Sequence, residues 1–135
     1  MIGWRARLGF LVPPGNPTVE TEMIAMAPQG VSLHFHRMVA HGTPGSLVGQ
    51  TERNRSMVEN IDSGIELLAL VKPETIIIAH TATSYHLGRR GEVELLDRLE
   101  RRPAAASSPP SVRWSARWSG SKSANWRSAL PIRRR

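Results

Sequence analysis

The hydrophobic and polar positions of the first hundred residues predict three strands. Residues 7–12 form a short apolar run that ends at Pro13-Pro14-Gly15, which indicates a buried strand followed by a loop. Residues 31–36 alternate with a period of two and predict a second strand. Residues 75–79 form a continuous run rich in β-branched side chains, which is typical of a parallel strand covered on both faces.

Three helices are expected between and after these strands. The first has Asn16 as N-cap and Pro17 at its first helical position. The second spans about residues 51–70 with one apolar face, and the third spans residues 91–102. Residues 80–88 are expected to form a polar loop. Because strands and helices alternate, the sequence predicts an α/β fold, with a parallel sheet, flanking helices and right-handed crossovers.

The composition changes abruptly at Arg102. Residues 1–102 contain eleven Lys/Arg and eleven Asp/Glu, whereas residues 103–135 contain seven Lys/Arg, eight Ser, three of the four Trp and no acid. The whole formal charge of +7 therefore lies in the last 33 residues, which show no helical or strand period. We divide the chain into an α/β half-domain, residues 1–102, and a basic Ser/Arg/Trp tail, residues 103–135, expected to be disordered or non-native.

Composition also excludes several kinds of site. The chain has no Cys, and therefore no disulfide, no thiolate metal site and no cysteine nucleophile. No pair of histidines has a metal-binding spacing, and neither a metal nor another cofactor is expected. The apolar run near the N-terminus is too short for a signal sequence, and no run is long enough to span a membrane. We expect a cytoplasmic protein with no membrane partner.

The first loop with candidate chemistry is formed by residues 13–18. It leaves the carboxyl end of a predicted strand, where open parallel sheets bind ligands, and it leads into a helix N-terminus, whose free N–H groups attract anions. Pro14 and Asn16 are candidate substrate-binding residues in this loop. A helix cap that contacts no ligand is the alternative interpretation of Asn16. The loop is neither a phosphate-binding loop nor a dinucleotide-binding glycine motif, so no nucleotide is indicated.

The second such loop follows the strand of residues 75–79. It offers His80, a candidate acid/base that titrates near neutral pH. Its hydroxyl groups are suited to hold a carboxylate or a developing oxyanion, and they belong to Thr81, Thr83 and Ser84. The alternative interpretation is a Ser/Thr-rich turn with a hydrogen-bonded histidine. His34 and His36, which alternate on the predicted second strand, are interpreted as structural.

The residues of both loops resemble one enzyme family. Residues 8–23 (LGFLVPPGNPTVETEM) and 76–84 (IIIAHTATS) are similar to the opening strand and loop, and to the third strand and catalytic loop, of one branch of the aspartate/glutamate racemase superfamily. That branch contains the maleate cis–trans isomerases and arylmalonate decarboxylases. The resemblance covers about residues 6–101. It implies two pseudosymmetric α/β halves, with a cofactor-independent active site between them that acts on small mono- or dicarboxylates.

The resemblance also implies roles for individual residues. By position, Asn16 and Thr81 would hold a carboxylate, while Thr83 and Ser84 would support the oxyanion. His80 stands where the family has the first of its catalytic cysteines. Because the family uses one or two cysteines and this chain has none, isomerisation by a pair of thiolates is not expected.

The tail is compatible with a family sequence read in another frame. If its codons are read one base earlier, residues 103–112 admit Thr-Gly and Phe-Ile-Thr-Ala-Phe-Gly, and residues 126–133 admit Ala-Leu-Gly-Thr-Pro-Tyr-Pro. Both segments resemble the family's continuation. We therefore hypothesise a truncated, frameshifted family member that lacks the opposing half of its site and is inactive as given. The less favoured alternative is an α/β binding or regulatory domain whose basic tail binds nucleic acid. The sequence is compatible with a homo-oligomer in either case.

Overall fold

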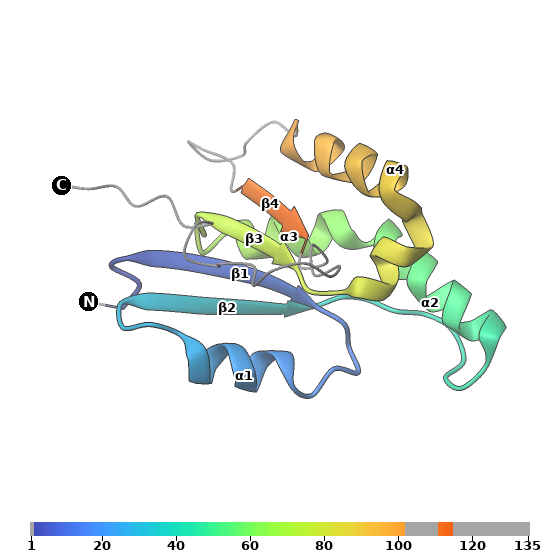
Figure 1. Cartoon of the computed structure of the whole chain (residues 1–135), viewed down its shortest axis with the longest axis horizontal. Coiled ribbons are helices and arrows are strands. Elements are labelled where there is room, and N and C mark those ends of the chain that lie inside the picture. Colours follow the sequence, from blue (N-terminus) through green and yellow to red (C-terminus); the bar gives the residue numbers. More distant parts are fainter. Residues whose placement is uncertain (1, 102–110, 115–135) are drawn as a thin grey trace.

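The computed structural model describes residues 2–101 and 111–114 of the 135-residue chain. These residues form a four-stranded parallel sheet with the strand order β2-β1-β3-β4 (Figure 1). The predicted α/β fold with a parallel sheet and flanking helices is confirmed. The strands are β1 (Ala6–Val12), β2 (Val31–Arg37), β3 (Thr75–Ile78) and β4 (Ser111–Trp114).

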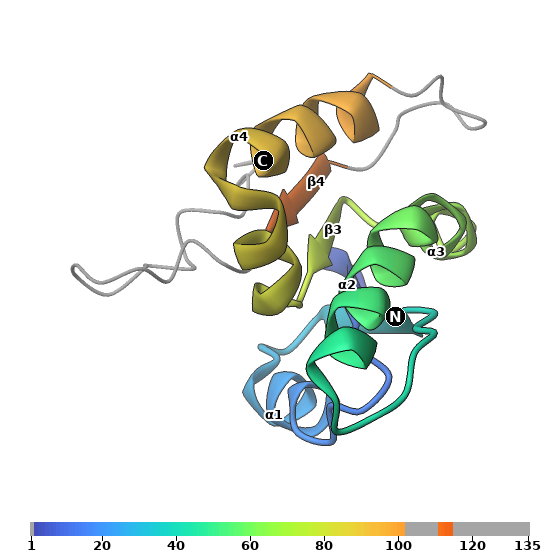
Figure 2. The ribbon, with the colours of Figure 1, turned by 90° about the vertical axis from the view of Figure 1, so that its right-hand side faces the viewer.

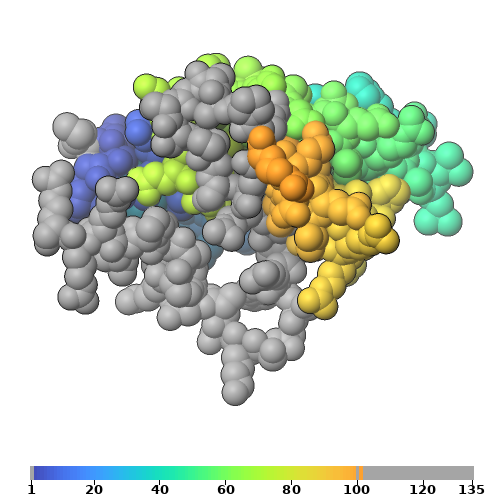
Figure 3. Space-filling view, turned by 90° about the horizontal axis from the view of Figure 1, so that it is seen from above, coloured from blue at the N-terminus to red at the C-terminus, as the bar shows by residue number. Residues whose placement is uncertain are grey.

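Helices connect the strands and flank the sheet: α1 (Val19–Met26), α2 (Leu47–Glu59), α3 (Ile61–Ala69) and α4 (Thr81–Glu100). α1 lies beside β2, across the sheet from α3 (Figures 1 and 2). Seen from above, α4, in yellow to orange, lies beside the green surface of α2 and α3 (Figure 3). Among the described helices, none has the length and apolar character needed to cross a membrane.

The hydrophobic core lies between the sheet and the helices α2, α3 and α4. Leu11, Ile76 and Ile78 on the two central strands are fully buried. They pack against buried side chains of the three helices, namely Met57, Ile61, Ile65, Leu68, Leu95 and Leu99. The apolar face predicted for residues 51–70 is therefore confirmed as a core face. At the edge of this layer, an ion pair of 2.6 Å between Arg98 Nη1 and Asp62 Oδ2 joins α4 to α3.

The single helix predicted over residues 51–70 is in fact two helices. α2 begins earlier, at Leu47, because the Ser46 hydroxyl accepts a hydrogen bond of 3.0 Å from Gly49 N and caps it. It ends at Glu59, and the side-chain amide of the C-cap residue Asn60 donates to the carbonyl oxygen of Ser56 over 2.8 Å. An asparagine side chain that bonds to the backbone in this way competes with continuation of the helix, and α3 starts anew after it.

The predicted polar loop of residues 80–88 is also wrong, because helix α4 begins at Thr81. The helix changes direction at Gly88, which has φ 65° and ψ 171°. This left-handed conformation is accessible to glycine without strain, and it joins two helical segments into one element. Thr and Ser favour the first turn of a helix, and their clustering here marks a helix start as well as a loop.

One strand lies inside the predicted tail. Residues 111–114 form β4 and pair in parallel with β3, from Thr75 opposite Ser111 to Ile78 opposite Trp114. The expectation that no strand follows residue 102 is therefore corrected. Without β4, the outer edge of β3 would leave backbone N–H and C=O groups unpaired, and a short segment can pair there without a periodic pattern of its own. The rest of the predicted tail lies outside the described residues.

Candidate functional site

Two connections leave the carboxyl ends of the central strands and meet at one cleft. β1 continues into residues 13–18 and leads to β2, whereas β3 continues through His80 into α4 and leads to β4 on the other side. This reversal is the switch point at which open α/β sheets bind ligands. Figure 2 looks onto this end of the sheet. The cleft has a volume of about 320 Å³ and is lined by Pro13, Pro14, Gly15, Asn16, Pro17, Gln50, Arg53, Met57 and His80.

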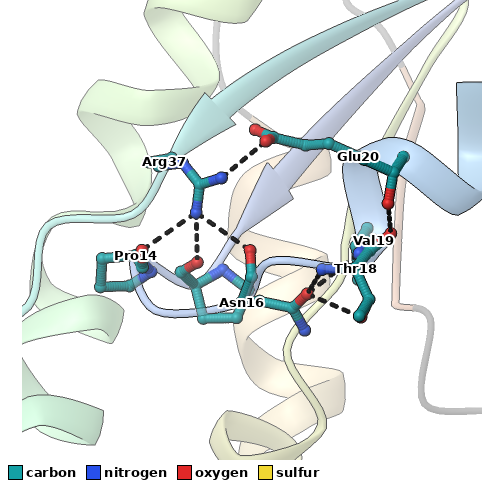
Figure 4. Close-up of polar contacts among 8 residues, drawn as sticks. Pro14, Asn16, Thr18, Val19, Glu20 and Arg37 are labelled. Atoms are coloured by element: carbon teal, nitrogen blue, oxygen red, sulfur yellow. Dashed lines mark hydrogen bonds and ion pairs between the residues drawn. The ribbon is translucent and has the colours of Figure 1, made fainter.

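Asn16 lies two residues before the N-cap of α1, which is Thr18, and its side chain binds the backbone at the helix start. Its Oδ1 accepts hydrogen bonds from Thr18 N at 2.9 Å, Val19 N at 3.0 Å and the Thr18 hydroxyl at 3.1 Å (Figure 4). The predicted N-cap position of Asn16 is wrong, because α1 begins at Val19 with Thr18 as its N-cap, but the Asn16 side chain still accepts from backbone N–H groups at the helix start. Because these contacts use the carbonyl oxygen, the amide Nδ2 keeps its two N–H donors and has no partner among the described residues. Asn16 can therefore bind the backbone at the start of α1 and offer a donor to the cleft at the same time.

Arg37, the last residue of β2, holds this loop in shape. Its Nη1 donates to three backbone carbonyl oxygens of the loop, those of Pro13 at 3.3 Å, Pro14 at 3.0 Å and Asn16 at 3.1 Å (Figure 4). Its Nη2 forms an ion pair of 2.6 Å with Glu20 in α1. Nη1 carries two N–H groups, so one of them is shared between two of the three carbonyl oxygens, while the planar guanidinium directs Nη2 to Glu20.

The importance of Arg37 was missed from the sequence, since it depends on the strand register that sets Arg37 opposite Val12. We predict that Arg37→Lys lowers the free energy of unfolding by about 1–2 kcal/mol, because an ammonium group keeps the charge but loses the forked contacts. Urea unfolding measures the change, and amide hydrogen exchange should show faster exchange in residues 13–18.

A matched control for this prediction is Arg90→Lys. Arg90 is exposed, and its side chain pairs with Glu94 one turn along α4 at 2.7 Å. Exposed pairs of this kind contribute little to stability, so we expect almost no change in unfolding. Equal effects of the two substitutions would contradict the role assigned to Arg37.

His80 lies between β3 and α4, where its side chain faces the cleft. Its Nδ1 is hydrogen-bonded to the hydroxyl of Thr83, and its Nε2 has no partner among the described residues. Burial lowers the pKa of His80 from its ordinary value of 6.5. The imidazole is therefore neutral at pH 7, with one nitrogen held and the other available to accept or donate a proton.

The hydroxyl groups predicted to act beside His80 point elsewhere. Thr83 is fully buried, and its hydroxyl is hydrogen-bonded to His80 Nδ1. This placement departs from the predicted contact of the Thr83 hydroxyl with an oxyanion. The Ser84 hydroxyl donates to Glu92 Oε2 at 2.8 Å, and Thr81 is exposed outside the cleft lining. The reason is that the segment is a helical turn, so successive side chains point in different directions. Three of the six predicted site residues line the cleft, namely Pro14, Asn16 and His80.

Helix α2 supplies a wall of the cleft that the sequence analysis did not single out. Gln50, Arg53 and Met57 line the cleft, and their spacing of three and four residues sets them on one face of the helix. That spacing was the available signal, but the sequence does not show which helix crosses the carboxyl edge of the sheet. In the described part of the chain, no Asp or Glu lines the cleft. The guanidinium of Arg53 gives the cleft lining a positive charge.

His34 and His36 lie away from this cleft. They border a second cavity, of about 340 Å³, between β2 and the apolar residues Leu67, Leu68 and Val71 around the end of α3. His34 Nε2 is hydrogen-bonded to the Ser32 hydroxyl at 3.1 Å. Within the described residues, no group of three acidic or histidine side chains is placed to hold a metal ion.

A comparison with solved structures gives an informative likeness. No protein-family model matches the chain, and no curated protein sequence matches it. Among solved structures, the chain is similar to the maleate cis-trans isomerase of Nocardia farcinica, in a cysteine-to-serine mutant with a covalently bound succinylcysteine intermediate. The TM-score is 0.59 and the sequence identity 29%, over 82% of this chain and 44% of that chain. The chain thus spans less than half the length of that isomerase, and the likeness supports a racemase-like fold.

Proposed function

We propose that this chain is part of a cofactor-independent isomerase, racemase or decarboxylase that acts on a small mono- or dicarboxylate. One observation carries the proposal: the loop of Asn16 and the strand end at His80 line a single cleft at the switch point of the sheet. The likeness to a maleate isomerase supports the same substrate class, because maleate is a small dicarboxylate.

The chemistry we propose for this cleft is proton transfer. The neutral imidazole of His80 would take a proton from the carbon next to the carboxylate and return it later. The enediolate formed in between would accept hydrogen bonds from Asn16 Nδ2 and from the backbone N–H groups at the start of α4. In this proposal, Thr81 contributes its backbone N–H, and Thr83 positions His80 through the hydroxyl–imidazole hydrogen bond.

The covalent route of the similar isomerase is not part of the proposal. The intermediate of that enzyme is a cysteine adduct, and this chain contains no cysteine. An imidazole at His80 can move a proton at neutral pH without forming a bond to carbon. The wall of the cleft that this chain supplies therefore supports proton transfer next to a carboxylate, with no nucleophile of its own.

We also propose that residues 103–135 are translated out of frame. The abrupt loss of acidic residues and the codon compatibility of the tail support this. The chain as given would then carry one wall of a two-walled active site and would be inactive. A cytoplasmic location and a homo-oligomeric state stay predictions from the sequence.

Substitution of Asn16 tests the carboxylate site. Asn16→Ser keeps an oxygen that can accept from the backbone N–H groups at the start of α1 but removes the amide donors, so stability should change little while the affinity for succinate falls. In the frame-restored protein, we expect a loss of about 1–3 kcal/mol in binding free energy, measured by calorimetry. Asn16→Asp keeps the contacts to the start of α1 and adds a like charge, and it should weaken binding further. Unchanged succinate affinity in both variants would rule out Asn16 as a ligand contact.

A further inference from the structure

We infer that Arg53 is the residue that recognises the carboxylate of the substrate and so determines the specificity of the cleft for anions. This inference rests on the proposed function, since it assigns a binding residue to the same cleft. Arg53 lies on α2, outside the two loops that carry the chemistry, and neither the motifs nor the loop sequences point to it.

The charge of the cleft is the first argument. The lining consists of Pro13, Pro14, Gly15, Asn16, Pro17, Gln50, Arg53, Met57 and His80. The histidine among them is neutral at pH 7, because burial lowers its pKa. The described walls thus carry one positive charge and no negative charge, and this charge attracts an anion to the cleft.

The lack of a partner for Arg53 is the second argument. The ion pairs of the described arginines involve Arg37, Arg55, Arg90, Arg98 and Arg101. The Arg53 side chain has no hydrogen bond or ion pair with another described residue, although it is half-buried. A guanidinium that has lost part of its hydration gains from a charged acceptor, and its planar fork fits both oxygens of a carboxylate.

The packing of the Arg53 stem is the third argument. Gly42 has φ 123°, and a Cβ built on it would lie 3.1 Å from Arg53 Cγ and 3.2 Å from Arg53 N. The backbone at Gly42 therefore lies directly against α2 at Arg53, an approach that a side chain at this position would obstruct. Since the stem is held from this side, the guanidinium loses less conformational entropy when it binds a ligand.

A titration of the 135-residue chain tests this inference. The Arg53 Nε–Hε resonance, assigned by its loss in Arg53→Gln, is followed by NMR as succinate is added at pH 7. Succinamide serves as the uncharged ligand of the same length. We expect succinate to shift the resonances of Arg53 and of the Asn16 and His80 amides, and succinamide to leave them unchanged.

Substitutions test whether Arg53 itself binds succinate or whether the net positive charge of the helix attracts it. Arg53→Gln should weaken succinate binding by about 10- to 100-fold, the range expected for loss of a charged hydrogen bond. Arg53→Lys should retain part of the affinity, because it keeps the charge but not the fork. The matched control is Arg55→Gln, which removes the same charge from the same helix at an exposed residue paired with Glu59. It should bind succinate like the wild type.

The outcomes distinguish this inference from the proposed function. If succinate shifts the cleft resonances equally in the wild type and in Arg53→Gln, the role of Arg53 is overturned and the carboxylate site stands. Equal weakening by Arg53→Gln and Arg55→Gln overturns it as well, because net charge would then explain the binding. If the wild type shows no shift with succinate, the carboxylate assignment itself fails, and the inference fails with it.

Discussion

Replacement of His80 by glutamine should lower the turnover of the frame-restored enzyme by about 10²–10⁴-fold, the usual contribution of a general acid/base. Glutamine keeps a polar side chain of similar reach but cannot take up a proton. Substrate affinity should change much less, since the carboxylate contacts come from other groups in the cleft. Steady-state kinetics with small carboxylates that carry a hydrogen on the saturated carbon next to the carboxylate measure both quantities, and wild-type turnover in the His80→Gln variant would leave His80 with a structural role.

The pH profile gives this prediction a second readout. Burial holds the pKa of His80 below 6.5, so the neutral form that accepts a proton predominates at pH 7. As the pH falls through this lowered pKa, the imidazole becomes charged and kcat/KM should decline. The acid limb of the profile is therefore expected below pH 6.5, and it should be missing from the residual activity of His80→Gln.

A control variant and a positioning variant support the assignment. His86→Gln changes an exposed histidine of α4 outside the cleft and should leave both turnover and the acid limb unchanged. Thr83→Val removes the hydroxyl that bonds to His80 Nδ1 and leaves a side chain of similar volume. We expect it to lower kcat and to move the acid limb, with a smaller effect on KM. An acid limb unchanged in Thr83→Val would contradict the positioning role of Thr83.

Strands β1, β2 and β3 could be predicted because their patterns are local, whereas β4 has no pattern of its own and was missed. The apolar runs of β1 and β3 and the alternation in β2 are properties of consecutive residues, and a parallel sheet follows from their alternation with helices. The same logic predicted that both chemistry-bearing loops would leave carboxyl ends of strands. Neighbouring parallel strands end at one edge, and Asn16 and His80 line the same cleft there.

The supporting residues could not be predicted, because they depend on contacts between distant segments. Arg37 reaches the loop of residues 13–18 through the pairing of β2 with β1. Arg53 reaches the cleft because α2 lies near the carboxyl edge of the sheet. The helical start of α4 was missed for a different reason. Thr and Ser are compatible with both turns and first helical turns, and packing of Leu87 against the core favours the helix before the break at Gly88.

Restoration of the reading frame should convert an inactive chain into an active one. We expect that one base has been lost near codon 102, because the composition changes there and the earlier frame admits family residues in both segments of the tail. Sequencing of the gene through and beyond codon 135 should then reveal a continuous shifted frame of roughly a hundred further residues, the size of one small α/β half.

The longer protein would supply the opposing wall of the cleft, and a site closed on both sides binds a small ligand more tightly because it buries most of the ligand surface. The 135-residue chain should show no turnover, whereas the frame-restored protein should convert a small carboxylate without added cofactor. A stop codon within a few dozen codons of the shifted frame would refute this origin of the tail, and turnover by the 135-residue chain itself would show that one wall is sufficient.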